Sequence, residues 1–144
     1  MSKNYDFDLK DFLPYLLNQA AEETSRKFEP HYKARYGMLR TEWRVIFHLG
    51  RYGKLTAKAI CDRARMHKTK VSRAVQSLES KGFLQRQRSV DDRRHELLAL
   101  TPTGDSVFID LFEEAQKFDA DLMSKFTEED QKALRQMLTA IVGL

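Results

Sequence analysis

The sequence is poor in cysteine, in proline and in long apolar runs. It has one cysteine and three prolines in 144 residues, which excludes an intrachain disulfide and a metal site built from several cysteines. No apolar run approaches the roughly 18 residues that a membrane span requires. The start "MSKNYDFDLK" also lacks the apolar middle of a secretory signal. We therefore expect a cytoplasmic protein without a membrane partner, folded around a single core.

Patterns that carry enzyme chemistry are missing as well. The sequence has neither a glycine-rich phosphate loop nor the turn that exposes a nucleophilic serine. Its four histidines are scattered, with no pair at helical ligand spacing: His31, His48, His67 and His95. Cys61 follows Ile60 in a helical pattern and is interpreted as a buried, inert thiol. We expect no catalytic site, no metal and no cofactor.

Positive charge is concentrated in one part of the chain. Residues 51–94 hold 13 Lys/Arg and 4 Asp/Glu, a net charge of +9, whereas the remaining 100 residues carry a net charge of −5. A merely solvating surface would mix the two signs. Binding of a polyanion requires cations gathered on one face, so the segregation favours nucleic acid as a partner.

The N-terminal third is predicted to form two helices. Helical spacing of Leu and Phe predicts the first from Leu9 to about Tyr36, and we expect Pro30 to kink or break it. Thr41 is a candidate N-cap for the second, and Gly50 and Gly53 bracket its expected end.

Two further helices follow at the interval of a helix-turn-helix. Thr56 is placed to cap the short helix "KLTAKAICDRA", and about three residues separate that helix from "KTKVSRAVQSLESKG". In the latter, apolar residues recur at i, i+3, i+4 and i+7, at Val71, Ala74, Val75 and Leu78. We predict a recognition helix over residues 68–81, with Gly82 placed to stop it.

The remaining elements complete a winged helix-turn-helix. "FLQRQRS" and "HELLALT" are strand candidates that form a wing over residues 83–101. Thr101-Pro102 opens a long amphipathic helix, and Thr127 restarts a final one. The predicted fold is mainly α with a small two- to three-stranded β wing. In it, a DNA-binding lobe (37–101) lies between helical regions (1–36 and 102–144) that we expect to form a homodimer interface.

The predicted recognition helix has side chains suited to a DNA groove. Its apolar stripe leaves a face without acids in its N-terminal half, formed by Lys68, Thr69, Lys70, Ser72, Arg73 and Gln76. Arg can bond the edge of guanine, Gln that of adenine, and Thr a thymine methyl group or a phosphate. The two lysines are better suited to phosphates. A solvated helix face is the alternative, but it would usually mix Glu with Lys.

The wing adds further candidate DNA contacts. Arg86 and Arg88 lie in its first strand, and "SVDDRRH" at its tip contains Asp92, Arg93 and Arg94. An arginine there could enter the minor groove, where the negative potential is focused, while Asp92 holds its rotamer. A solvated hairpin tip remains the alternative.

The chain from about Leu9 onward resembles the MarR family of bacterial transcription regulators. The similarity rests on Trp43 in "LRTEWRVIFHLG", on "KTKVSRAVQSLESKGFL" and on the wing "DDRRHELLALT". It implies an obligate dimer that binds a palindromic operator, often as a repressor. It also implies that a small phenolic or carboxylic ligand could release the DNA.

Two residues of the predicted turn depart from the family pattern. The family often has Gly in this turn and Asp or Ser opening the recognition helix, whereas this chain has Arg65 and His67. A left-handed Arg65 would cost about 1 kcal/mol relative to Gly, so we expect a differently shaped turn.

A small aromatic or carboxylic effector is expected to bind the dimer. Candidate lining residues, each of which could equally be ordinary core packing, are Phe12, Tyr15, Trp43, Arg44, Phe47, His48 and Arg51. We expect a ligand to act by changing the distance between the two recognition helices, which must lie about 34 Å apart.

Three alternatives remain open. One is a DNA-binding dimer without an effector, regulated by abundance or by oxidation of Cys61. Another is an enzyme-associated module that uses the winged helix as an interaction platform. The third, binding of single strands or RNA, predicts aromatic residues within the basic run, where Phe83 stands nearly alone.

Overall fold

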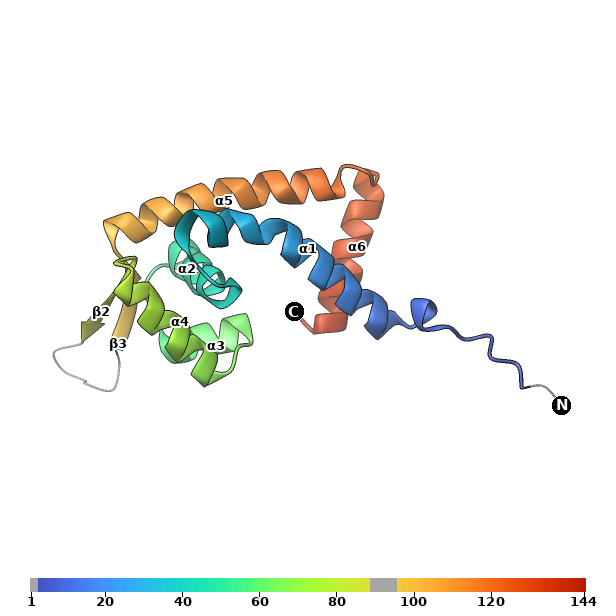
Figure 1. Ribbon diagram of the computed structural model, residues 1–144, viewed down its shortest axis with the longest axis horizontal. Helices are drawn as coiled ribbons and strands as arrows, with labels where there is room; N and C mark the ends of the chain where they lie inside the picture. Colours follow the sequence, from blue (N-terminus) through green and yellow to red (C-terminus); the bar gives the residue numbers. More distant parts are fainter. Residues whose placement is uncertain (1–2, 89–95) are drawn as a thin grey trace.

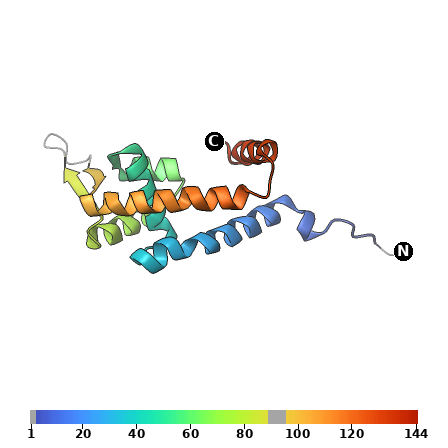
Figure 2. The same ribbon diagram turned by 90° about the horizontal axis from the view of Figure 1, so that it is seen from above.

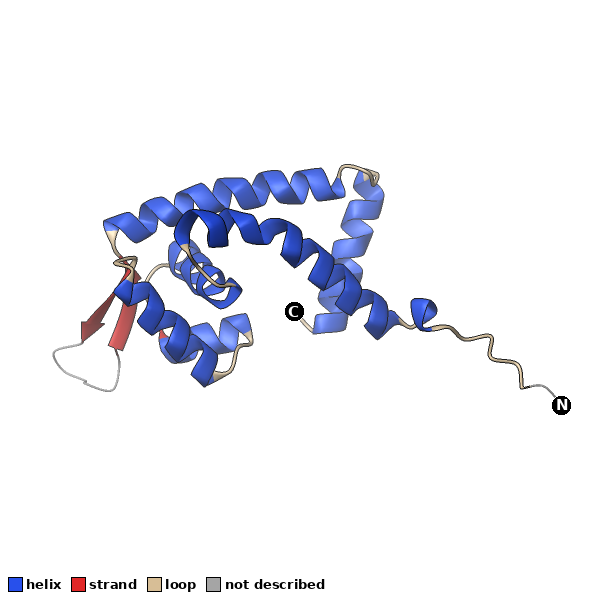
Figure 3. Ribbon diagram, in the orientation of Figure 1, coloured by secondary structure: helices blue, strands red, loops and turns tan. Residues whose placement is uncertain are grey.

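The computed structural model describes residues 3–88 and 96–144, which are mostly helical. The helices are η1 (Leu9–Asp11), α1 (Leu13–Tyr36), α2 (Arg40–Tyr52), α3 (Ala57–Ala64), α4 (Lys68–Ser80), α5 (Pro102–Met123) and α6 (Glu128–Val142). The strands are β1 (Leu55–Thr56), β2 (Leu84–Arg88) and β3 (Glu96–Leu100). Figure 3 shows a small sheet at one end of a mostly helical molecule, in agreement with the predicted fold class.

Threonine hydroxyls start three of the helices as the sequence predicts. Thr56 accepts a hydrogen bond from the amide of Ala59, and Thr101 and Thr127 make the equivalent bond at α5 and α6. The expected cap of α2 at Thr41 is wrong. The N-cap is Leu39, two residues earlier, and the carboxylate of Glu42 accepts from the amide of Leu39 at 2.6 Å.

A break at Pro30, one of the two outcomes expected there, is also wrong. Pro30 lies inside α1, which continues to Tyr36. Proline removes one backbone hydrogen bond, and the buried side chains of Phe28 and Tyr32 on either side hold this part of α1 against the core. The expected end of α2 between Gly50 and Gly53 is confirmed, because the helix ends at Tyr52 and Gly53 is its C-cap. A Cβ at position 50 would lie 2.2 Å from the ring of Phe108 of α5. The absence of a side chain at Gly50 therefore lets α5 pack closely against α2.

One continuous core joins the terminal helices to the predicted DNA-binding lobe. Phe28 of α1 and Leu111 of α5 belong to the same cluster as Ile46 of α2 and Val71 of α4. Ring pairs extend this cluster across α1, α2 and α5, with Trp43 lying 5.5 Å from Phe28 between ring centroids. The lobe is therefore fixed to the terminal helices by shared apolar packing.

The sheet is antiparallel, with strand order β1-β3-β2. Leu84 pairs with Leu100 and Arg88 with Glu96, so β2 and β3 form the two sides of the wing. The short β1 pairs with β3 through Leu55 and Leu98. This third strand ties the wing to the segment that leads into α3.

Two helical segments extend beyond the packed core of the protein. Figures 1 and 2 show α1 and α5 side by side and antiparallel over α2, α3 and α4. The N-terminal part of α1 projects away from the lobe, and α6 turns back from the end of α5. None of the described helices is long and apolar enough to cross a membrane.

Candidate nucleic-acid interface

Helix α4 presents one apolar and one polar face, as its periodicity predicts. Val71, Ala74, Val75 and Leu78 are buried against the core. The opposite face is exposed and comprises the residues predicted to contact DNA: Lys68, Thr69, Lys70, Ser72, Arg73 and Gln76. Burial of the apolar stripe therefore orients these six side chains together toward solvent.

The turn before α4 keeps the left-handed conformation despite having no glycine. Arg65 has φ 51° and ψ 48°, so the expectation of a differently shaped turn is wrong. Its guanidinium donates to the carbonyl of Val142 at 2.6 Å, at the C-terminal end of α6. A cation at a helix C-terminus is favourable and offsets part of the backbone cost. His67 then caps α4, with Nδ1 accepting from the amide of Thr69 at 3.2 Å.

The two arginines of β2 differ in how firmly neighbouring carboxylates hold their side chains. Arg86 donates to Glu79 of α4 through Nε and to Glu96 of β3 through Nη1, each at 3.2 Å. Arg88 is 81% exposed and lies 3.8 Å from Glu96. Arg86 thus joins the recognition helix to the wing, whereas Arg88 extends into solvent. The predicted tip residues Asp92, Arg93 and Arg94 lie outside the described residues.

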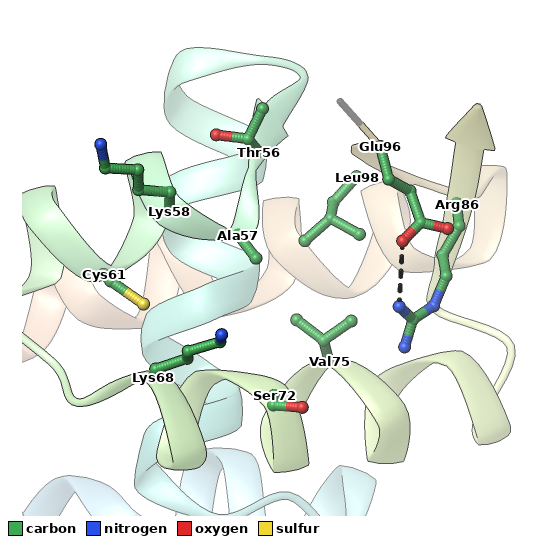
Figure 4. A pocket seen from close by; sticks show the side chains of 10 residues that line it. All are labelled: Thr56, Ala57, Lys58, Cys61, Lys68, Ser72, Val75, Arg86, Glu96 and Leu98. Atoms are coloured by element: carbon green, nitrogen blue, oxygen red, sulfur yellow. Dashed lines mark hydrogen bonds and ion pairs between the residues drawn. The ribbon is translucent and has the colours of Figure 1, made fainter. Parts of the chain in front are cut away.

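A cavity of about 690 Å³ opens between α3, α4 and the sheet. Figure 4 shows Val75 and Leu98 on its apolar side and Lys58, Lys68 and Arg86 around it. The side chain of Cys61 also lines it and is half-buried, although the sequence predicted a buried thiol. The cavity therefore adjoins the exposed face of α4.

A buried carboxylate joins α2 to the end of α4, and the sequence analysis missed it. Glu42 is 2% exposed and accepts hydrogen bonds from Ser77 Oγ at 2.5 Å, Lys81 Nζ at 2.8 Å and the amide of Leu39. Burial opposes its ionisation, but the bonds from Lys81, Ser77 and Leu39 outweigh this and hold the pKa of Glu42 below its usual value. A single acid within an otherwise apolar helix pattern was the available signal.

The residues suggested for effector binding are not all brought together. Trp43 and Phe47 pack within the aromatic cluster, with ring centroids 5.3 Å apart, and His48 lies beside Phe47. Arg44 and Arg51 are exposed on α2. Phe12 and Tyr15 lie near the projecting N-terminal end of α1 and are also exposed. Within one copy of the chain these residues form no common cavity among the described pockets.

A further polar contact fixes α1 against α5. The hydroxyl of Tyr36 donates to Asp110, and Arg35 donates to the same carboxylate at 3.2 Å. Burial and the bond to Asp110 raise the pKa of Tyr36 to about 12. Among the described residues, no group of three or more His, Cys, Asp or Glu could hold a metal ion.

Comparison with known proteins agrees with this geometry. A sequence model of the MarR family matches residues 36–95. The uncharacterized HTH-type transcriptional regulator YwoH of Bacillus subtilis strain 168 is 26% identical over 125 residues, covering 87% of this chain and 90% of YwoH.

Solved structures share the fold over nearly the whole chain. A MarR/EmrR family transcriptional regulator from Acinetobacter sp. ADP1 superposes with a TM-score of 0.85 at 23% identity, covering 95% of this chain and 96% of that one. NadR in complex with 4-hydroxyphenylacetate superposes with a TM-score of 0.75 at 20% identity, covering 98% and 97%. Over residues 36–95, which include the recognition helix and part of the wing, the chain is thus similar to the MarR family, and its fold is the one seen in solved transcriptional regulators of that family.

Proposed function

We propose that this protein is a DNA-binding transcriptional regulator of the MarR family, a homodimeric repressor that binds a palindromic operator and is released by a small aromatic or carboxylic effector. In this proposal α4 enters the major groove and the wing, including Arg94 at its tip, reaches the adjacent minor groove. The observation that carries the proposal is the exposed, acid-free face of α4 from Lys68 to Gln76.

The side chains on that face divide into two kinds of contact. Thr69, Arg73 and Gln76 lie at i, i+4 and i+7 and form one line suited to base edges. Lys68 and Lys70 flank this line and suit the phosphates. Arg88 adds a cation in the wing, and Arg86, held by Glu79 and Glu96, fixes the wing beside α4.

Dimerisation is supported by apolar side chains that the single chain leaves exposed. They lie on α6 and at the beginning of α1, and include Leu9, Leu13, Leu16, Leu134, Met137, Leu138, Ile141 and Val142. Apolar side chains left exposed along a helix in this number mark an association site. A two-fold partner would also place two copies of α4 on successive turns of DNA.

Binding of an effector is supported by the likeness to NadR, which holds 4-hydroxyphenylacetate. Arg44 and Arg51 are exposed cations on α2 that could receive a carboxylate. Phe12 and Tyr15 would reach this region if the second copy contributed them. Regulation by oxidation of Cys61 is the alternative, supported by the position of its thiol in the cavity wall.

Fluorescence anisotropy tests the proposed function. A labelled duplex from upstream of the protein's own gene and a scrambled duplex of the same composition are titrated with the wild type and with Arg73→Ala. We expect the wild type to prefer the upstream duplex, with affinity that falls steeply with salt. Arg73→Ala should lose about tenfold or more of that preference. Lys117→Ala, on the exposed face of α5, is the matched control and should behave as the wild type.

The effector is tested on the same complex. 4-Hydroxyphenylacetate is added to the bound upstream duplex, and Arg51→Gln is compared with the wild type. Release of DNA from the wild type and weaker release from the variant support a carboxylate site on α2. Equal anisotropy with and without the compound argues against this effector.

A further inference from the structure

Glu42 is the one buried charged residue in the part of the chain that the structure describes. Its carboxylate joins two helices, because it lies in the first turn of α2 and accepts from Ser77 and Lys81 at the end of α4. The ammonium of Lys81 also donates to Ser77 at 2.7 Å, which closes a three-residue network. The amide of Leu39 occupies the other carboxylate oxygen at 2.6 Å.

Stability alone is a poor reason for this network. Removing a carboxylate and an ammonium from water costs several kcal/mol per ion, and apolar replacements of buried ion pairs are often as stable or more so. Hydrogen bonds are directional, however, whereas apolar contacts let a helix roll or slide by small amounts. A network anchored on the first turn of α2 therefore restricts the orientation of the end of α4.

Lys81, the residue that follows α4, is placed differently from the lysines within that helix. Lys68 and Lys70 are exposed with the proposed base-contacting line, whereas Lys81 is turned toward Glu42 and its side chain is 27% exposed. Its charge is balanced by the carboxylate at 2.8 Å. A lysine so paired cannot release a counterion from DNA without first leaving Glu42.

We propose that Glu42 is a positioning residue for DNA recognition, which fixes the angle of α4 through Ser77 and Lys81 and withholds Lys81 from the phosphates. This inference rests on the proposed entry of α4 into the major groove. It predicts that the network affects discrimination between DNA sequences and leaves the number of phosphate contacts unchanged.

The double variant Glu42→Gln/Lys81→Met tests the inference without leaving a buried charge unpaired. Wild type and variant are titrated with a duplex selected from a random pool by the wild type, and with a random duplex of equal length, over a range of NaCl concentrations. Urea unfolding, followed through the single Trp43, establishes that both proteins are folded. Lys70→Met is the matched control, since it removes an exposed lysine from the same helix.

A positioning role predicts about a tenfold loss of preference for the selected duplex in the double variant, with the salt slope unchanged. In the proposed dimer Lys70→Met removes two phosphate contacts, so it should reduce the slope by about 1.8 while retaining the preference. If the double variant does not fold, Ser77→Ala removes one bond of the network, and we expect the same loss to a smaller degree.

Two results would overturn the inference. A salt slope reduced in the double variant as in Lys70→Met would make Lys81 a phosphate contact. An unchanged preference in a folded variant would make the network purely structural. If the wild type selects no duplex, the proposed groove contact of α4 is contradicted instead. That outcome differs from the two above, because in both of those the wild type selects a duplex.

Discussion

At the scale of single residues, Glu42 makes stability depend on pH. The hydrogen bonds that lower its folded-state pKa stabilise the protein at pH values above the unfolded-state pKa of about 4.3. That stabilisation is lost as the pH falls through the lowered folded-state value. We expect Glu42→Gln to reduce the free energy of unfolding by about 2 kcal/mol at pH 7, because Lys81 then loses its buried partner.

The difference between wild type and Glu42→Gln should shrink as the pH falls below about 4.3. Urea unfolding at several pH values between 7 and 3 measures it. Glu113→Gln, which changes an exposed glutamate of α5, serves as the control and should follow the wild type at every pH. A difference that stays constant down to pH 3 would contradict ionisation of Glu42 as its source.

The side chain of Arg65 compensates for an unfavourable backbone. Arg65→Gly and Arg65→Ala both remove the bond to α6, but only Gly also relieves the left-handed strain. We therefore expect the Gly variant to be more stable than the Ala variant by about 1 kcal/mol. Hydrogen exchange should also show faster opening of the last turn of α6 in both. Equal stabilities of the two variants in urea would contradict this account.

At the scale of elements, the start of α5 is fixed by close contact with Phe83, the residue directly before β2. The chain approaches so closely at Gly104 that a Cβ would lie 1.9 Å from the carbonyl oxygen of Phe83. Backbone cannot move aside as a flexible side chain can. We expect Gly104→Ala to reduce the free energy of unfolding by about 2–3 kcal/mol.

Gly143→Ala is the matched control for this prediction, because the added Cβ meets open space. The only cost there is that of an alanine in the left-handed conformation, with φ 81°. Its cost should be at most about 1 kcal/mol. Thermal or urea unfolding of both variants measures the difference. Similar losses in the two would show that backbone conformation, and not the contact with Phe83, determines the effect at Gly104.

At the scale of the whole molecule, the exposed apolar face of α6 is the feature that supports the proposed dimer. Met137 is 61% exposed there, and a charge at this position would have to be buried in the proposed dimer. We expect Met137→Glu to weaken self-association at least tenfold, measured by sedimentation at several concentrations. Operator affinity should fall with it, since one half-site then binds without the other.

Gln136→Glu adds the same charge to the polar side of α6 and should leave the dimer intact. A wild type that sediments as a monomer at concentrations where it binds its operator would contradict the dimer. Loss of association in both variants would point to a general charge effect and not to the apolar face.

The helix-turn-helix and its exposed residues were predictable because their signals are local. The periodicity that buries Val71 and Leu78 also directs Arg73 outward, and Thr56 and Thr101 cap their helices through bonds three residues away. The terminal helices and the wing strands follow from the same kind of pattern. The expected sites on the wing tip lie outside the described residues and stay predictions.

The errors arose where distant parts of the chain meet. Pro30 was expected to interrupt α1, but packing of the surrounding helix against the core outweighs the lost bond. The end of α2 between Gly50 and Gly53 was predictable, but the contact of Gly50 with Phe108, more than fifty residues later, leaves no mark on local sequence. The residues suggested for effector binding on α1 and α2 lie apart in one copy, and their role stays a prediction.

The sequence by itself determined the order of elements and the polar face of α4, because capping and periodicity act over one or two turns. The tertiary structure alone decided which charges are paired. It buried Glu42 beneath Ser77 and Lys81, held Arg86 between Glu79 and Glu96, and brought Arg65 to the end of α6. Such pairings depend on distances between helices, which the spacing of residues along the chain does not contain.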